Sequence, residues 1–210
     1  MNIWLAPLLA FALLNAAPED LPEMVPMEVP LTERGYALVD RQHGVRVYEH
    51  QHADIIRIAA EGRFAAPPER VQQVLLDYER HAGRVERVSV SRVLARRDER
   101  MLVYQRLNLP LISDRDFNLL VRWGEDEGRR WIHYRTASQG RPARPGVVRV
   151  CHHRGSWQLE ALPGGRGSRA RYQSSIDMAG MLPRWMARSG VGDEVPGLFT
   201  AIRKMLAEDR

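Results

Sequence analysis

Residues 101–123 read MLVYQRLNLPLISDRDFNLLVRW, and the architecture of the chain can be worked out from them. Apolar and polar side chains alternate on both sides of a short loop that contains Pro110, which is typical of two half-buried strands. A parallel connection needs a dozen or more residues, so a loop of this length makes the two strands antiparallel neighbours. The segment therefore predicts a hairpin with one face turned towards an apolar interior.

The same alternation recurs along most of the chain. Strand-like runs, separated by turn residues, occupy 44–50, 54–64, 86–95, 101–109, 116–123, 130–137, 147–162 and 169–178. Helical spacing of apolar residues marks 69–84, 182–189 and 195–206, with a break at 189–192 between the last two. We expect one α+β domain, in which a curled antiparallel sheet packs its concave face on the apolar stripe of a long C-terminal helix.

The first 30 residues differ in composition from the rest. Residues 3–14 (IWLAPLLAFALL) are uncharged, too few to span a bilayer, and typical of the apolar core of a secretory signal. We expect residues 1–17 to be a signal peptide and the protein to be periplasmic or secreted; a retained N-terminal helix is the alternative. Residues 18–30 hold four prolines and four acidic residues, which predicts a linker before a folded domain at 31–210.

Composition excludes several kinds of site and partner. The 210-residue chain has one cysteine, Cys151, so an intramolecular disulfide and a multi-cysteine metal cluster are both excluded. The net charge is +5, and Lys204 is the one lysine among 31 basic residues, which leaves 31 − 1 = 30 arginines. These arginines are scattered among acidic residues, whereas nucleic-acid binders gather charge on one face. We expect no nucleic-acid partner, and transient contact with anionic lipid head groups.

Three ordered motifs carry a resemblance to a known family. Residues 109–117 (LPLISDRDF) place Ser-x-Arg-Asp-aromatic at a strand start, 145–150 (PGVVRV) open a later strand, and 177–190 (DMAGMLPRWMARSG) lead into the last helix. Together they resemble the START domains, lipid-transfer modules of the helix-grip (Bet v 1-like) fold, in a bacterial-type exported form. Met178-Ala179 stand where that family has Pro-Gly. The resemblance implies a monomeric carrier that encloses one lipid in a tunnel between sheet and C-terminal helix, without cofactor or covalent chemistry.

Arg115 is the polar candidate on the second strand of the hairpin. It shares a strand face with Phe117 and Leu119, so the alternation turns it towards the interior. A buried guanidinium needs a carboxylate or a polar group of a ligand, because its desolvation is costly. The resemblance implies that it is a polar group of the lipid tunnel. A structural ion pair between two strands is the alternative.

Gln105 is the corresponding candidate on the first strand. It is the one polar member of an apolar face that includes Val103, Leu107 and Leu109. Its neutral amide both donates and accepts hydrogen bonds, which suits a ligand hydroxyl. An outward-facing Gln105 at a sheet edge is the alternative interpretation.

The entry to the last helix is rich in methionine and carries a tryptophan. The candidate ligand-binding residues there are Met178, Met181, Leu182, Trp185 and Met186. Methionine repacks around ligands of varied shape, so this segment and the apolar loop at 110–112 predict an adaptable lid. Tryptophan is also favoured at a bilayer interface. Plain packing of a helix on a sheet is the alternative.

The sequence favours a binding protein over an enzyme. The seven histidines show no metal-ligand spacing, so we expect surface positions for them and no metal. Nucleophile elbows, phosphate loops and dinucleotide-binding motifs are absent. We therefore expect no enzymatic activity. The alternative is a catalyst of the polyketide cyclase/aromatase type on the same architecture, with Arg115, His133, Tyr134 and Asp177 as acid–base candidates. A membrane-surface protein with a filled core is a third possibility. Sterols, hopanoid-like polycyclic lipids, phospholipids and fatty acids all stay open as ligands.

Overall fold

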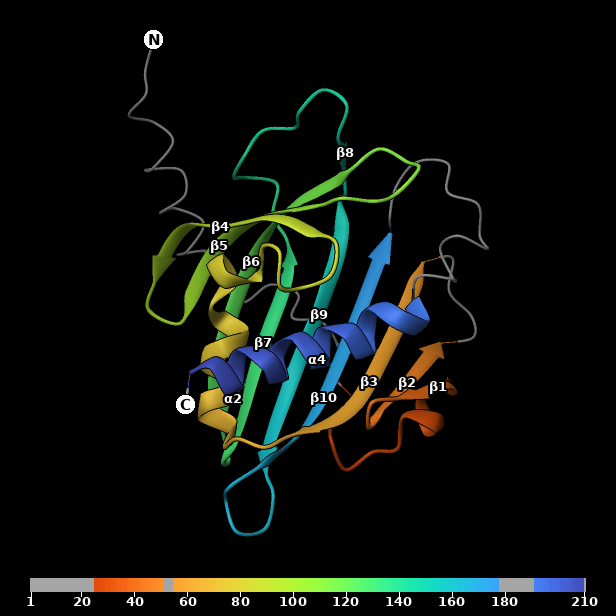
Figure 1. Ribbon diagram of the computed structural model, residues 1–210, viewed down its shortest axis with the longest axis vertical. Coiled ribbons are helices and arrows are strands. Elements are labelled where there is room, and N and C mark those ends of the chain that lie inside the picture. Colours follow the sequence, from red (N-terminus) through yellow and green to blue (C-terminus); the bar gives the residue numbers. More distant parts are fainter. Residues whose placement is uncertain (1–24, 51–54, 178–190, 210) are drawn as a thin grey trace.

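The computed structural model describes residues 25–50, 55–177 and 191–209 of the chain (Figure 1). In chain order its strands, α-helices and 3-10 helices (η) are η1 (Leu31–Arg34), β1 (Tyr36–Gln42), β2 (Val45–His50), β3 (Ile56–Phe64), α2 (Pro68–Leu76), η2 (Tyr78–His81), β4 (Val88–Arg97), β5 (Arg100–Leu107), β6 (Arg115–Asp126), β7 (Arg129–Thr136), β8 (Val148–Arg149), β9 (His152–Ala161), β10 (Ser168–Asp177) and α4 (Val191–Glu208). None of the described helices is long and apolar enough to cross a membrane.

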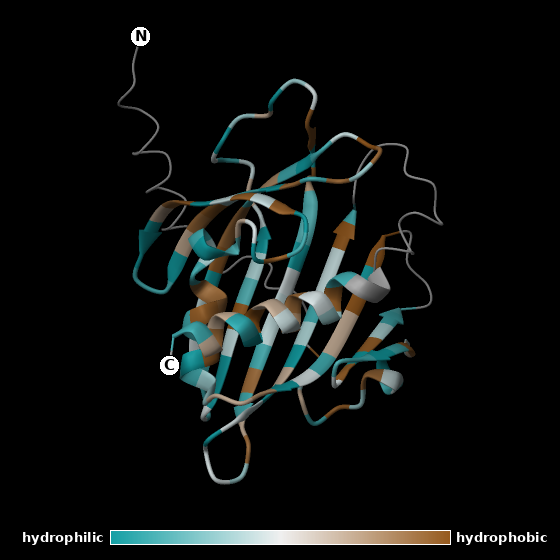
Figure 2. Ribbon diagram, in the orientation of Figure 1, coloured by the Kyte–Doolittle hydropathy of each residue, from teal (hydrophilic) through white to brown (hydrophobic). Residues whose placement is uncertain are grey.

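Within the described residues, ten strands form one curled sheet with open edges, in the order β1-β2-β3-β10-β9-β7-β6-β5-β4, and β8 pairs with β6. The pairs along this order are antiparallel; the short β6–β8 pair is parallel. Pairing of β3 with β10 joins the early strands to the late ones. Apolar and polar residues alternate along the strands (Figure 2), and α4 crosses the inner face of the sheet (Figure 1). The predicted architecture is confirmed.

Helix α4 is held on the sheet by its apolar stripe. Phe199, Ile202 and Met205 are fully buried, at intervals of three residues, which place side chains on one helix face. The ring of Phe199 stacks on Phe64, with ring centroids 5.3 Å apart. Gly62 of β3 makes this approach possible, because a Cβ there would lie 2.7 Å from the Phe199 ring. The predicted helical break does not extend to residues 191 and 192, which are helical.

Two other elements differ from their predicted lengths. The helix predicted over 69–84 ends at Leu76, because the backbone of Asp77 leaves the helical region with a ψ of 64°, and η2 follows. The strand predicted over 147–162 is divided into β8 and β9. Arg149, in β8, lies opposite Asp116 of β6 and forms an ion pair with it, with 2.6 Å between Nε and Oδ1.

Strand β1 was absent from the prediction. It is an edge strand with half-buried and exposed residues and a bulge between Leu38 and Asp40, so its hydrophobic period is broken.

Residues 25–30 are packed against the outer face of the sheet, which differs from the predicted linker. Arg171 of β10, 2% exposed, donates hydrogen bonds to the carbonyl oxygens of Pro26 and Val29 and pairs with Glu61. Gln158 of β9 donates to the carbonyl oxygen of Val25 at 2.8 Å. The domain therefore includes residues before Leu31. Residues 1–24, with the predicted signal peptide, lie outside the described residues.

Candidate ligand-binding cavity

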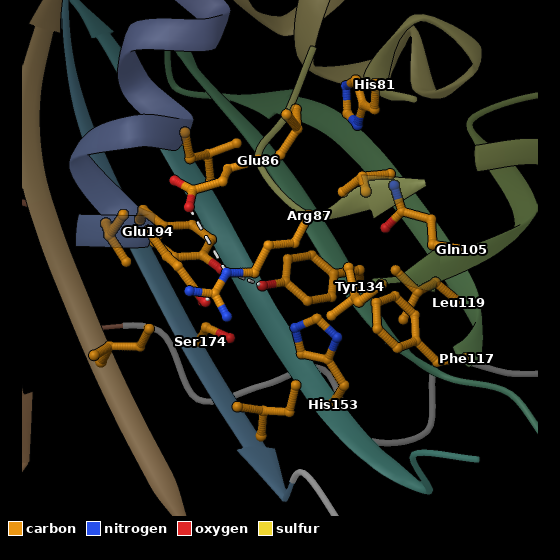
Figure 3. Close-up of a pocket in the computed structure, with 18 of the residues that line it drawn as sticks. His81, Glu86, Arg87, Gln105, Phe117, Leu119, Tyr134, His153, Ser174 and Glu194 are labelled. Atoms are coloured by element: carbon orange, nitrogen blue, oxygen red, sulfur yellow. Dashed lines mark hydrogen bonds and ion pairs between the residues drawn. The ribbon is translucent and has the colours of Figure 1, made fainter. Parts of the chain in front are cut away.

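A cavity of about 270 Å³ lies between the inner face of the sheet, the loops beside β4 and β5, and α4 (Figure 3). Most of its lining is aliphatic or aromatic. The apolar lining residues are Ile56, Ile58, Leu75, Val85, Val88, Leu107, Leu109, Pro110, Ile112, Phe117, Leu119, Ile132, Trp157, Ile176, Val195 and Leu198. A concave apolar space with a few polar groups is the usual form of a site for a small apolar molecule.

An ion pair lies at the rim of this cavity. Arg87, in the loop before β4, places its Nε 2.9 Å from Oε1 of Glu194 on α4 and 3.7 Å from Oε1 of Glu86. Figure 3 shows Arg87 extending into the space between Glu194 and Tyr134. Burial raises the pKa of Glu194; Glu86 adds to this rise and Arg87 opposes it. The pair ties the loop to the helix across the cavity.

The inner wall carries a group of hydroxyls on neighbouring strands. The hydroxyl oxygens of Tyr134 (β7) and Tyr172 (β10) lie 3.0 Å apart, and Ser174 hydrogen-bonds to both. Gly155, between Tyr134 and Ser174 in the sheet, makes room for them, because a Cβ there would lie 2.4 Å from the Tyr134 hydroxyl. Burial raises the pKa of both phenols, so they stay protonated at neutral pH.

Two histidines line the cavity in their neutral form. Burial lowers the pKa of His153 to about 3, and that of His81 to about 4 against a weaker opposing hydrogen bond to the backbone of Val74. The ring of His153 lies edge-on to Phe117 and Tyr134, with centroids 4.9 and 5.0 Å away. Its Nδ1 is covered by protein and has no hydrogen-bond partner among the described residues.

Gln105 also faces the cavity, from β5. Its Nε2 donates a 3.0 Å hydrogen bond to Oγ of Ser91 on β4, the residue opposite it in the sheet. The side chain is 7% exposed, so the outward-facing alternative does not apply. Because this bond uses the amide nitrogen of Gln105, its amide oxygen can still accept a hydrogen bond from a ligand.

The cavity can therefore enclose an apolar molecule and meet its polar end with hydroxyl, amide and imidazole groups. In the part of the chain that the structure describes, no three histidine, cysteine or carboxylate side chains come close enough to hold a metal ion.

No family model and no curated protein matches the chain, whereas solved structures do. The STAR-related lipid transfer protein of Xanthomonas axonopodis (fragment 25–204) is 24% identical, with a TM-score of 0.75 over 82% of this chain and 99% of that one. Human STARD10 is 18% identical, with a TM-score of 0.74 over 90% of this chain and 83% of that one. This chain has the START fold.

The same fold occurs in an enzyme. The Zhui aromatase/cyclase of Streptomyces sp. R1128 is 16% identical, with a TM-score of 0.55 over 73% of this chain and 94% of that one. The START fold alone therefore does not distinguish a carrier from a catalyst. The side chains that line the cavity decide between the two.

The START fold brings five of the predicted ligand-binding residues to the cavity. These are Gln105, Leu107, Leu109, Phe117 and Leu119. The strand alternation placed them there, because residues two apart on β5 and β6 share the inner face. Pro110 and Ile112 of the predicted apolar loop line it as well.

Seven predicted residues are not among the described residues of the lining. Val103 is fully buried in the core beside the cavity. Arg115 is 4% exposed, as expected for an inward position, and donates from Nη1 to the carbonyl oxygen of Ser113. The other five, Met178, Met181, Leu182, Trp185 and Met186, lie outside the described residues.

The structure does not bring the acid–base candidates of the enzymatic alternative together in the cavity. Of the four, Tyr134 alone lines the cavity as far as the described residues show. His133, its neighbour on β7, points to the opposite face, where burial and Arg122 lower its pKa to about 4. Asp177 is exposed at the end of β10.

Sequence reasoning missed His81, His153, Tyr172, Ser174 and the Arg87–Glu194 pair. Surface positions were expected for the histidines, which is wrong for His81, His133 and His153. For His153 a signal was present, since it shares its strand face with Trp157 and Leu159, two buried apolar residues. The Arg87–Glu194 pair had no such signal, because α4 meets the loop only in the folded chain.

Proposed function

We propose that this protein binds one lipid in the cavity and carries it between membranes. The observation that carries the proposal is the cavity itself, which is lined mainly by apolar side chains and covered by α4. Hiding apolar ligand surface in such a space contributes ~25 cal/mol per Å², which supplies most of the affinity for a lipid. The likeness in fold to proteins named for lipid transfer supports this function.

We further propose that the protein acts as a monomer outside the cytoplasm and meets membranes transiently. The apolar run at residues 3–14 supports export, and the net charge of +5 supports attraction to anionic head groups.

A non-enzymatic role is part of the proposal, with an aromatase/cyclase-like reaction as the second candidate because Tyr134 faces the cavity. General-base catalysis needs a group that accepts a proton near neutral pH. The phenols of Tyr134 and Tyr172 hold their protons, and burial disfavours the protonated form of His153. The carboxylates among the described lining residues, Glu86 and Glu194, are at the rim beside Arg87.

Lipid retention tests the proposed function. The delipidated protein is incubated with a total lipid extract, repurified and analysed by native mass spectrometry. We expect one lipid per chain. A Leu119→Trp variant should retain less, because the indole fills the cavity from β6. A Val39→Trp variant, altered at an exposed position on β1 away from the cavity lining, serves as the matched control. Absence of retained lipid in the unaltered protein contradicts the proposal.

A further inference from the structure

The charged and polar side chains around the cavity favour lipids with an uncharged head group over lipids with an anionic one. We propose that the ligand is a lipid whose polar end is an uncharged hydrogen-bonding group, such as a hydroxyl or a carbonyl, and that this end lies against Tyr134, His153, Tyr172 and Ser174. Carboxylate and phosphate head groups are disfavoured. The inference rests on the proposed function, since it concerns which lipid the cavity holds.

The inner wall offers several hydrogen-bonding groups within reach of one another. Tyr134 and Tyr172 touch through their hydroxyls at 3.0 Å, Ser174 bonds to both, and the ring of His153 lies 5.0 Å from that of Tyr134. Figure 3 shows Tyr134, His153 and Ser174 directed towards the same part of the cavity from three neighbouring strands. The apolar lining surrounds this group, so it marks the place for the polar end of a ligand.

This inner group carries no charge at neutral pH. Burial raises the pKa of both phenols and lowers that of His153 to about 3, which keeps all three neutral. A carboxylate or phosphate placed there would lose its hydration, and the one cation of the described lining, Arg87, is already beside two carboxylates, so the loss is poorly compensated. A hydroxyl or a carbonyl loses much less hydration and can bond to the same groups.

The rim adds a second barrier to anions. Arg87 is the one lysine or arginine among the described lining residues, and it is already beside Glu194 and Glu86. Two carboxylates thus surround one guanidinium. An anionic head group that approached Arg87 would have to displace Glu194 and would still face both carboxylates, a like-charge contact that disfavours binding.

His153 gives the uncharged polar end a specific partner. Its ring is part of the cavity lining, edge-on to Phe117 and Tyr134, whereas Nδ1 itself is covered by protein. A neutral imidazole nitrogen is a donor or an acceptor according to the tautomer, and a lipid hydroxyl can meet either form. The ring of His153 can therefore bond to an uncharged hydroxyl without a change of its own charge.

A matched pair of probes tests the inference: a long-chain fatty alcohol and the fatty acid of the same chain length, each titrated against the delipidated protein at neutral pH by displacement of a fluorescent apolar dye. We expect the alcohol to bind at least about tenfold more tightly, a ratio that corresponds to about 1.4 kcal/mol. Equal affinities, or tighter binding of the acid, overturn the inference.

Variants at the rim test the charge argument separately. The double variant Glu86→Gln, Glu194→Gln should bind the acid several-fold more tightly and leave the alcohol unchanged. Glu33→Gln, at an exposed carboxylate on η1, should change neither affinity. An unchanged affinity of the double variant for the acid overturns the argument.

The lipid retained from the total extract separates this inference from the proposed function. A retained lipid with an uncharged head group supports both. A retained fatty acid or phospholipid upholds the proposed function and overturns the inference about the head group. Retention of no lipid overturns both.

Discussion

Nε of Arg87 lies 2.9 Å from Oε1 of Glu194, so an ion pair joins the loop before β4 to helix α4 at the rim of the cavity. A lipid that enters or leaves between the loop and the helix has to pass this pair. Both side chains are partly exposed, at 31% and 42%, and an ion pair in such a position contributes at most about 1 kcal/mol.

Removal of this ion pair should speed ligand exchange. For Arg87→Gln we expect the dissociation rate of bound lipid to rise by about two- to fivefold, the range that an energy of up to about 1 kcal/mol allows. The rate can be followed by stopped-flow transfer of a fluorescent lipid to acceptor vesicles. Glu125→Gln is the matched control, because it removes an ion pair of similar length (2.8 Å to Arg130) that contains no residue of the cavity lining. Equal rates in Arg87→Gln and in the unaltered protein would show that the pair does not restrain the loop.

Stability should fall as the solution is acidified below about pH 6.5. His81 and His153 have folded-state pKa values lowered to about 4 and about 3, against about 6.5 in an unfolded chain. As the pH falls, these histidines therefore bind protons in the unfolded chain before they do so in the folded one. The contribution of the two neutral histidines to the free energy of unfolding is complete above pH 6.5 and is lost as the pH falls towards their folded-state pKa values. Between pH 7 and pH 5 we expect a loss on the order of 1–2 kcal/mol per histidine.

Urea unfolding at a series of pH values measures this loss. A His81→Phe variant should show a shallower fall of the free energy of unfolding with acidification. His43→Asn should keep the full slope, because His43 is exposed in a turn with a φ of 50°, which asparagine tolerates. If the free energy of unfolding falls with acidification equally in the unaltered protein and in His81→Phe, the lowered pKa of His81 is contradicted.

Arg171 should be the arginine on which stability depends most. It is 2% exposed, pairs with Glu61 and donates to carbonyl oxygens of residues 25–29. Arg171→Met leaves Glu61 without this partner and frees the N-terminal segment, so we expect a loss of about 3 kcal/mol in the free energy of unfolding. Arg169→Gln on the same strand removes an exposed pair with Glu160 and should cost less than about 1 kcal/mol. Similar losses in the two variants would rule out the anchoring role.

Gly155→Ala should disturb the inner wall of the cavity. The added methyl group would lie 2.3 Å from the carbonyl oxygen of Gln173 and 2.4 Å from the hydroxyl of Tyr134. The sheet or the Tyr134 ring has to move, which we expect to cost about 1–3 kcal/mol of stability and to weaken lipid binding. Thermal unfolding and dye displacement measure the two effects, and Gly197→Ala on α4, where the nearest atom is the flexible end of Glu86 at 3.2 Å, is the comparison. Unchanged unfolding and binding would contradict the close packing at Gly155.

The period of two along the strands predicted most of the sheet and part of the cavity lining from the sequence. Because successive side chains point to opposite faces, Gln105, Leu107, Phe117 and Leu119 could be assigned to the interior without a structure. The apolar stripe of the last helix indicated what covers that interior. Edge strand β1 could not be predicted in this way, because a half-exposed edge strand does not need a regular alternation of apolar residues.

The sequence by itself determined most strands of the curled sheet, the covering helix and the apolar inner face of β5 and β6, because these follow from local periodicity. The tertiary structure alone decided which polar groups meet: Arg87 with Glu194 from the loop and α4, Tyr134 with Tyr172 and Ser174 across three strands. Among the described residues, the tertiary structure also places this inner group and the Arg87–Glu194 pair in the cavity lining, and does not place Arg115 there. Such contacts depend on strand order and helix crossing, which are set by the packing of the whole core, and no short stretch of sequence contains them.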